Sequence, residues 1–213
     1  MPNRAVLFDL DGVIVDSRPH HISAWHELAR RHDLRHDPDY FTRMFGLRND
    51  AILGGLGIAP PDTPPLAAEK ETLFREAARG HAEALPGVRD LLDALDAAAV
   101  PRAVVTSTPR ENLDLVLDSL KLAGRFQALV AEEDATKGKP DPEGFLVAAR
   151  LLGVQPAACV VIEDAPAGLR AARTAGMRAI GVTTTHPAPD LGDAGLVVDS
   201  LAEEAVRTFI FRD

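Results

Sequence analysis

Cysteine, tryptophan and tyrosine each occur only once in this chain of 213 residues, and aromatic residues make up only 5% of it. A single cysteine excludes an intrachain disulfide, and Cys159 lies in the apolar run 157–162, which is typical of a buried and unreactive thiol. No stretch approaches the roughly 18 apolar residues of a membrane span, and residues 1–9 lack the apolar segment of a secretion signal. We therefore expect a cytoplasmic protein.

Positive charge is also scarce, because 23 Lys and Arg stand against 32 Asp and Glu, a formal net charge of −9. This balance disfavours nucleic acid, which is bound by clustered Lys and Arg. The apolar fraction of 46% and the charged fraction of 26% are typical of globular proteins. We expect a folded monomer whose partner is a small metabolite, with neither a nucleic acid nor a membrane as partner.

Short apolar runs along the chain predict strands that are buried on both faces. Such runs, separated by amphipathic segments, are typical of a parallel sheet covered by helices. The predicted strands are residues 5–8, 103–106, 128–131, 159–162, 179–182 and 196–198, and the predicted helices include residues 88–98, 110–120, 142–152 and 167–175. The pattern predicts an α/β fold with a doubly wound parallel sheet.

The interval between the first two predicted strands is much longer than one crossover helix needs. Residues 18–80 have helical patterns without a convincing strand, and turn residues such as Gly54-Gly55 interrupt them. We expect a helical cap domain, residues 16–80, inserted into a catalytic core domain of residues 1–15 and 81–213.

Acidic pairs follow two of the predicted strands. Asp9 and Asp11 end the first strand, and Glu163 and Asp164 end the fourth. Each pair alone could be an Asp-rich turn or a helix cap, but parallel strands bring their carboxyl ends to one edge, where α/β proteins build sites. Four carboxylates gathered there would repel one another unless a hard cation lay among them. The sequence therefore predicts a Mg²⁺ site.

Groups suited to phosphate follow the acids. Residues 106–108, Thr-Ser-Thr, lie where the second predicted strand ends and before a helix, a place where hydroxyls and backbone amides bind anions. Lys139 lies in a loop restricted by Pro140 and Pro142, and its charge would balance that of a phosphate. Ordinary helix capping and a solvated lysine remain the alternatives.

Taken in order, Asp9-Leu10-Asp11-Gly12, Thr106-Ser107, Lys139-Pro140 and Glu163-Asp164 resemble the four motifs of the haloacid dehalogenase-like hydrolase superfamily. The resemblance spans nearly the whole chain, and four motifs in order are specific although each alone is weak. Asp16-Ser17, the segment with His21 and Trp25, and residues 163–168 resemble the branch that holds β-phosphoglucomutase and small sugar-phosphate phosphatases.

The resemblance implies a role for each of these side chains. Asp9 would be the nucleophile that forms an aspartyl phosphate, and Asp11 the general acid and base. Ser107, Thr108 and Lys139 would hold the phosphoryl group.

The resemblance also implies a set of metal ligands. Mg²⁺ would be bound by the Asp9 side chain, the Asp11 backbone carbonyl and Asp164. Glu163 would orient a water molecule on the metal.

The resemblance leaves open whether water or a second sugar hydroxyl accepts the phosphoryl group. His21, Arg48 and Lys70 resemble cap positions that the mutase uses for its substrate. Ser17 and Glu71 depart from the mutase, which has threonine and asparagine there, and the 48–50 loop also differs. We favour a phosphatase, with the mutase as the alternative.

Other interpretations compete with these. His21 could border the core beside Trp25, Lys70 could lie on a solvated charged face, and Arg48 could serve a turn. A phospho-acceptor signalling domain lacks the long insert and has its acids adjacent. A metal-independent dehalogenase does not explain the Glu163-Asp164 pair.

Overall fold

The computed structural model describes residues 4–212 and divides the chain into two compact units. The core unit consists of Met1–Asp16 and Glu83–Asp213, and the inserted unit of Ser17–Ala82. Among the described residues, no helix combines the length and the apolar character needed to cross a bilayer.

The core unit is built on a six-stranded sheet with the order β3-β2-β1-β4-β5-β6, in which every neighbouring pair is parallel. The strands are β1 (Ala5–Phe8), β2 (Arg102–Val105), β3 (Ala128–Val130), β4 (Cys159–Glu163), β5 (Arg178–Val182) and β6 (Leu196–Val198). Each predicted strand is confirmed, with ends that differ by no more than one residue. Because all strands run the same way, their carboxyl ends share one edge.

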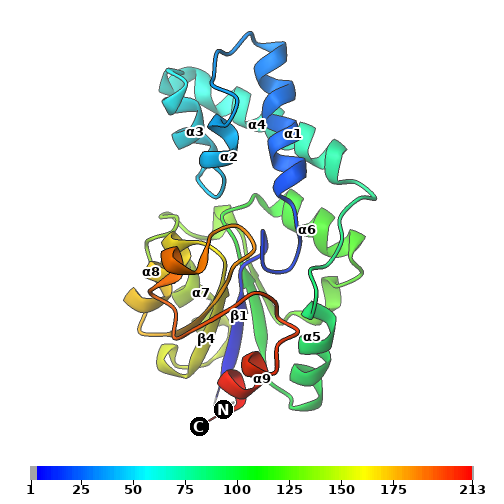
Figure 1. Cartoon of the computed structure of the whole chain (residues 1–213), viewed down its shortest axis with the longest axis vertical. Helices are drawn as coiled ribbons and strands as arrows, with labels where there is room; N and C mark the ends of the chain where they lie inside the picture. Colours follow the sequence, from blue (N-terminus) through cyan, green and yellow to red (C-terminus); the bar gives the residue numbers. More distant parts are fainter. Residues whose placement is uncertain (1–3, 213) are drawn as a thin grey trace. The chain divides into compact units, whose positions relative to one another are not determined.

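Helices cover both faces of this sheet, as the apolar runs predict. They are α5 (Val88–Ala97), α6 (Arg110–Ser119), α7 (Glu143–Leu152), α8 (Pro166–Thr174) and α9 (Glu204–Phe211). In Figure 1, α7 and α8 lie to one side of β1 and α5 and α6 to the other. Phe145 of α7 and Leu169 of α8 belong to a buried cluster with Leu7 of β1. The doubly wound α/β fold is therefore confirmed.

The only cysteine lies in this core. Cys159 opens β4 with 0% exposure, and its Sγ contacts the carbonyl of Gln155 at 3.5 Å. Burial raises the pKa of the Cys159 thiol to about 11, which leaves almost no thiolate at neutral pH. The predicted burial of Cys159 is confirmed, and the raised pKa supports an unreactive thiol.

The inserted unit is helical, and its described residues contain no strand of the sheet. Its helices are α1 (Arg18–Arg31), α2 (Tyr40–Arg43), α3 (Asn49–Gly55) and α4 (Thr63–Ala78). Trp25 of α1 is 4% exposed and stacks on Phe41 of α2 with ring centroids 5.4 Å apart. Phe74 of α4 is fully buried in the same unit. Trp25 is therefore a packing residue of the inserted unit.

We predict that Leu91→Ala lowers the free energy of unfolding by about 2–5 kcal/mol, because Leu91 of α5 is completely buried and its truncation leaves a cavity. Leu151→Ala is the matched control, since Leu151 is 60% exposed, and we expect a change of no more than about 0.5 kcal/mol. Urea denaturation followed by circular dichroism measures both, and equal losses would contradict the assignment of α5 to the core.

Candidate functional site

Carboxylates gather where β1 and β4 end. Asp9, Glu163 and Asp164 each offer an oxygen within 4.8 Å of the others, and all three residues are buried. The backbone N–H of Asp9 donates to the carbonyl of Ile162 at 2.9 Å, which fastens the end of β1 to β4. The parallel pairing of two neighbouring strands therefore holds three acids together.

The ammonium group of Lys139 lies among these acids. Its Nζ donates to Asp9 Oδ1 at 2.5 Å, to Glu163 Oε1 at 2.6 Å and to the carbonyl of Val105 at 3.3 Å. These contacts use the three donors of an ammonium group. Lys139 thus joins the ends of β1, β2 and β4 and is no solvated bystander.

Glu163 is held on both of its oxygens. While Oε1 accepts from Lys139, Oε2 accepts the backbone N–H groups of Asp164 and Ala165, both at 3.0 Å. A β-carbon at Gly168, in the first turn of α8, would overlap the Glu163 carboxylate. The absence of a side chain at Gly168 therefore leaves room for Glu163 at the start of the helix.

Asp11 is turned to a different partner. The Thr108 hydroxyl donates to Asp11 Oδ2 at 2.6 Å, and the Thr106 hydroxyl accepts the backbone N–H of Thr108 at 3.1 Å. The Asp11 side chain does not belong to the three-carboxylate group. Ser107, which lies between the two threonines in the chain, is half-buried.

The crowded charges change the acidity of the site. Burial raises the pKa of Asp9 from its ordinary value of 3.8 to about 7; Lys139 opposes the rise, while Glu163 and Asp11 add to it. Burial, Glu163 and Asp9 likewise raise the pKa of Asp164. Although burial alone would lower the pKa of Lys139, Asp9 and Glu163 raise it, so the lysine stays charged. One ammonium therefore does not suffice to keep all the neighbouring carboxyl groups ionised.

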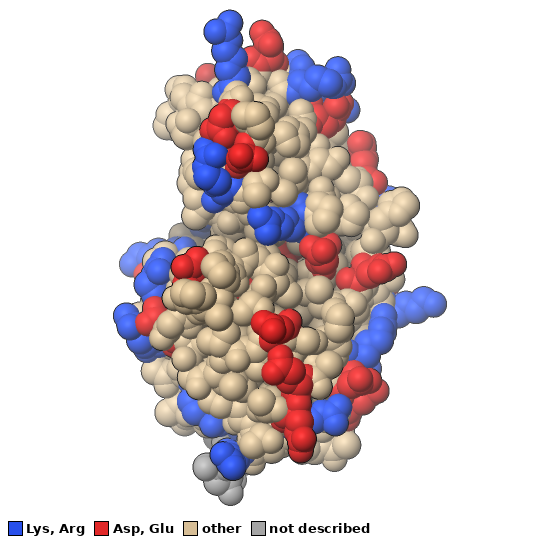
Figure 2. Space-filling view, in the orientation of Figure 1, with Lys and Arg blue, Asp and Glu red and all other residues tan. Residues whose placement is uncertain are grey.

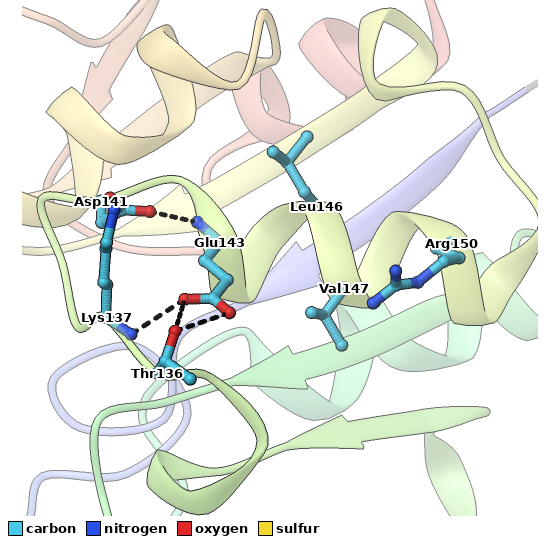
Figure 3. A pocket seen from close by; sticks show the side chains of 7 residues that line it. All are labelled: Thr136, Lys137, Asp141, Glu143, Leu146, Val147 and Arg150. Carbon is cyan, nitrogen blue, oxygen red and sulfur yellow. Dashed lines mark hydrogen bonds and ion pairs between the residues drawn. The ribbon is translucent and has the colours of Figure 1, made fainter.

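The loop that presents Lys139 is fastened to α7. The Glu143 carboxylate accepts from the Thr136 hydroxyl at 2.8 Å and from the backbone N–H of Lys137 at 2.9 Å, and Asp141 accepts the N–H of Glu143 at 3.0 Å (Figure 3). A pocket of about 410 Å³ lies beside this loop and α7. Its lining residues are Thr136, Lys137, Asp141, Glu143, Leu146, Val147 and Arg150. None of the buried acids lines it, so this pocket is distinct from the acid site.

The turn after β5 also reaches the site, and its residues were not among the predicted site residues. Thr184 donates to the carbonyl of Gly12, and Thr185 donates to Asp164 Oδ2. His186 Nδ1 lies 3.1 Å from the carbonyl of Asp164. Thr183, Thr184 and Thr185 directly follow a predicted strand, and the hydroxyl residues 106–108 likewise lie at a strand's end, so this position could have identified them as candidates.

The inserted unit holds a separate polar cluster. Lys70 Nζ is 2.7 Å from His21 Nδ1 and donates to Glu71 Oε1 at 2.9 Å, and Asn49 donates to the same oxygen at 2.7 Å. Lys70 is only 2% exposed, so the solvated-face alternative is wrong for it. Because an ammonium only donates, His21 Nδ1 accepts and the ring proton is on Nε2. Although burial opposes it, the neighbouring Lys70 lowers the pKa of Glu71.

His21 also packs against an aromatic side chain of the inserted unit, and Arg48 lies at the start of a helix. The His21 ring stacks on Phe74 with a centroid separation of 3.9 Å. Arg48 is itself the N-cap residue of α3, and its side chain makes no capping hydrogen bond. The structure therefore brings His21 and Lys70 together within the inserted unit and places Arg48 at a helix start.

The donor set of the acid site suits a hard divalent cation. Three buried carboxylates offer oxygen atoms at close range, and a single lysine leaves negative charge uncompensated. Such a group can bind a cation next to an anionic substrate and supply a nucleophile. The half-buried Asp11 beside it can supply a proton donor.

Comparison with known proteins agrees with this geometry. The family model of the haloacid dehalogenase-like hydrolases matches residues 3–176. Validoxylamine A 7'-phosphate phosphatase of Streptomyces hygroscopicus subsp. limoneus is 36% identical over 203 residues, which cover 94% of this chain and 95% of the relative. Beta-phosphoglucomutase of Bacillus subtilis (strain 168) is also 36% identical, over 194 residues that cover 86% of this chain and 85% of the relative.

A solved structure has the same fold. The beta-phosphoglucomutase of Clostridium difficile superposes with a TM-score of 0.83 at 29% identity, covering 97% of this chain and 96% of that chain. The suspected superfamily is therefore confirmed by the family model, by relatives and by the fold. This chain belongs to the haloacid dehalogenase-like hydrolases.

Proposed function

We propose that the protein is a Mg²⁺-dependent phosphatase that hydrolyses a small phosphorylated metabolite, in particular a sugar phosphate, through an aspartyl phosphate on Asp9. The observation that carries the proposal is the placement of Asp9. Its carboxylate is buried beside Lys139 and two further acids. The Asp11 side chain, two residues further along the chain, accepts a hydrogen bond from Thr108 instead. Nucleophile and proton donor are thus separate groups.

In the first half of the reaction, a carboxylate oxygen of Asp9 attacks phosphorus while the bond to the sugar oxygen breaks. Asp11 gives its proton to the departing oxygen, and Thr108 orients Asp11 for this transfer. Lys139 offsets the negative charge of the phosphoryl group. The half-buried Ser107 hydroxyl offers a further donor for the phosphoryl oxygens.

In the second half, Asp11 takes a proton from a water molecule, which attacks the phosphorus of the aspartyl phosphate. The bond between phosphorus and Asp9 breaks, and inorganic phosphate leaves. The same carboxyl group serves as acid and then as base, so both steps balance in protons.

The metal would be held by the side chains of Asp9 and Asp164 and by the backbone carbonyl of Asp11. When bound, Mg²⁺ supplies positive charge that stabilises the charge developing on the phosphoryl oxygens. Glu163 already accepts from Lys139 and two backbone amides, which suits it to orienting a water rather than binding the ion directly. Oxygen ligands and retained waters are typical of Mg²⁺.

The substrate class rests on the relatives and on the surface charge. The Streptomyces relative is named for a phosphatase of a phosphorylated compound. On the face drawn in Figure 2, Lys and Arg side chains lie dispersed among Asp and Glu, which suits a small substrate better than a polyanion. We assign His21, Arg48 and Lys70 of the inserted unit, acting as a cap, to recognition of the rest of the substrate.

The second candidate is a β-phosphoglucomutase-type mutase, because the Bacillus relative of that name has the same 36% identity as the Streptomyces phosphatase. In the mutase, a sugar hydroxyl replaces water as the acceptor. Glu71 supports the phosphatase, since it neutralises Lys70 and so reduces the positive charge available to a second phosphate.

We predict that the wild-type protein releases phosphate from several sugar phosphates in Mg²⁺, and that Asp9→Asn lowers kcat/KM by more than about 1,000-fold because the nucleophile is lost. Asp114→Asn, an exposed acid on α6, is the control and should retain activity. A phosphate-release assay with β-glucose 1-phosphate among the esters, also followed for glucose 6-phosphate, makes the measurement. Isomerisation with little phosphate release would identify the mutase instead, and activity that survives in chelator would contradict the metal.

The raised pKa of Asp9 predicts a pH-dependent stability of the metal-free protein. Folded Asp9 keeps its proton up to about pH 7, whereas an unfolded aspartate loses it near 3.8, so stability falls as the pH rises through this window. Mg²⁺ favours the ionised carboxylate and should raise Tm more at pH 8 than at pH 5.

Thermal unfolding with chelator or with Mg²⁺, at a series of pH values, tests this expectation. In Asp9→Asn the slope between about pH 4 and pH 7 should become shallower, because the group that titrates is gone. An unchanged slope in the variant would show that Asp9 does not titrate in this range.

We predict that Glu71→Gln lowers KM for a sugar bisphosphate relative to the matching monophosphate by about 3- to 10-fold, because Lys70 then lacks its carboxylate partner. Tm should also fall, since a buried pair is broken. Steady-state kinetics with both esters measure the ratio.

Glu76→Gln, an exposed acid on the same helix, removes the same charge without touching Lys70 and should leave the ratio unchanged. Equal ratios in Glu71→Gln and the wild type would argue against a role of the Lys70–Glu71 pair in substrate choice.

A further inference from the structure

The turn that follows β5, residues 183–186, touches both strand ends that carry the acids. Strand β5 is the neighbour of β4 in the sheet, so its carboxyl end emerges beside Asp164. Consecutive residues of the turn contact different elements: Thr184 reaches the loop after β1, and Thr185 reaches the end of β4. The turn therefore spans the two segments that supply the acids.

Thr185 fixes the Asp164 carboxylate by a directional contact. Its hydroxyl lies against Asp164 Oδ2 and 3.3 Å from the carbonyl of the same residue. A hydroxyl carries one proton, and Asp164 Oδ2 is closer to it than the carbonyl oxygen, so the proton points to Oδ2. One Asp164 oxygen is thereby held in place while the other stays available.

His186 completes this arrangement. Its Nδ1 lies 2.9 Å from the Thr185 hydroxyl oxygen and 3.1 Å from the carbonyl of Asp164. Because the Thr185 proton is directed at Asp164, Nδ1 must carry a hydrogen and donate to these two oxygens. The Thr185 hydroxyl then accepts one hydrogen bond and donates one, which leaves it a single orientation.

Thr184 holds the other segment. Its hydroxyl donates to the carbonyl of Gly12, directly after Asp11. Gly12 has a φ of +80°, and a β-carbon there would overlap the Asp164 carboxylate. The backbone of the β1 loop therefore lies against Asp164, and only glycine permits both the conformation and the approach.

We propose that Thr184 and Thr185 form a clamp, defined by these two residues, that positions the Asp164 carboxylate and the β1 loop for a divalent cation. They are positioning residues, because they act through Asp164 and Gly12. This inference rests on the proposed function, since it assigns the cation to the same acids. Without the clamp, Asp164 can rotate away from Asp9 and Glu163 to relieve repulsion, and the cation then has to pull it back.

Metal binding measured without turnover tests the clamp. Calorimetric titration with Mn²⁺, checked with Mg²⁺, gives Kd for the wild type and for Thr185→Val, which keeps the shape of the side chain but removes the hydroxyl. We expect Kd to rise about 10- to 100-fold, as for other side chains that orient a metal ligand. Thr184→Val should raise Kd less, because its contact is to the backbone and the side chain is exposed.

Two controls separate positioning from general damage. Thr183→Val removes a hydroxyl of the same turn that bonds to Asp199 at 2.6 Å, away from the acids, and should leave Kd unchanged. Thr185→Ala and Thr185→Ser both lose the methyl group and differ only in the hydroxyl, so serine should bind the metal close to wild type and alanine weakly. Comparison of the alanine and serine variants tests the hydroxyl even if Thr185→Val folds poorly.

The possible outcomes distinguish a failure of the clamp from a failure of the proposed metal site. A wild type that binds the metal and a Thr185→Ala variant that binds it equally well would overturn the clamp while leaving the proposed function intact. A wild type that binds neither metal would overturn the proposed metal site and the clamp together. Weakened binding in Thr183→Val of the same size would also overturn the clamp.

Discussion

The site depends on one ammonium group placed among buried carboxylates. Lys139 contacts Asp9 and Glu163 at hydrogen-bond distance, and without it the ends of β1 and β4 would meet with like charges only. The pairing remains incomplete, because Asp9 and Asp164 both retain raised pKa values. A buried cluster that is short of positive charge favours a cation and an anionic substrate arriving together, since each lessens the cost of burying the other.

Most of the fold follows from local patterns in the sequence. Apolar runs such as 159–162 have the length and composition of strands, and the helices between them bury one apolar face. Parallel topology then gathers Asp9 and Glu163 at one edge, because the strands that carry them are neighbours. These relations need only the type and order of elements, so the gathering of the core acids could be predicted before any coordinates. The superfamily is identified from the resemblance of the four motifs.

The remaining contacts could not be predicted, because they join residues that are distant in sequence. Nothing around Lys70 signals burial, since Glu69-Lys70-Glu71 has the composition of a surface, and His21 lies on another helix. Thr108 has the features of a phosphate ligand in the sequence, yet the folded chain turns it to Asp11. The Thr185 contact with Asp164 depends on the turn after β5, whose path no local pattern defines.

The buried thiol of Cys159 has a practical consequence for spectroscopy. Maleimides react with thiolates, and a pKa of about 11 leaves Cys159 roughly 300-fold less ionised than an exposed cysteine, whose pKa is about 8.5. Burial shields it further. Cysteines introduced on the exposed faces of α4 and α6 could therefore be labelled with fluorophores in an otherwise native background. Energy transfer between them would report, in real time, how far apart the two units are during turnover.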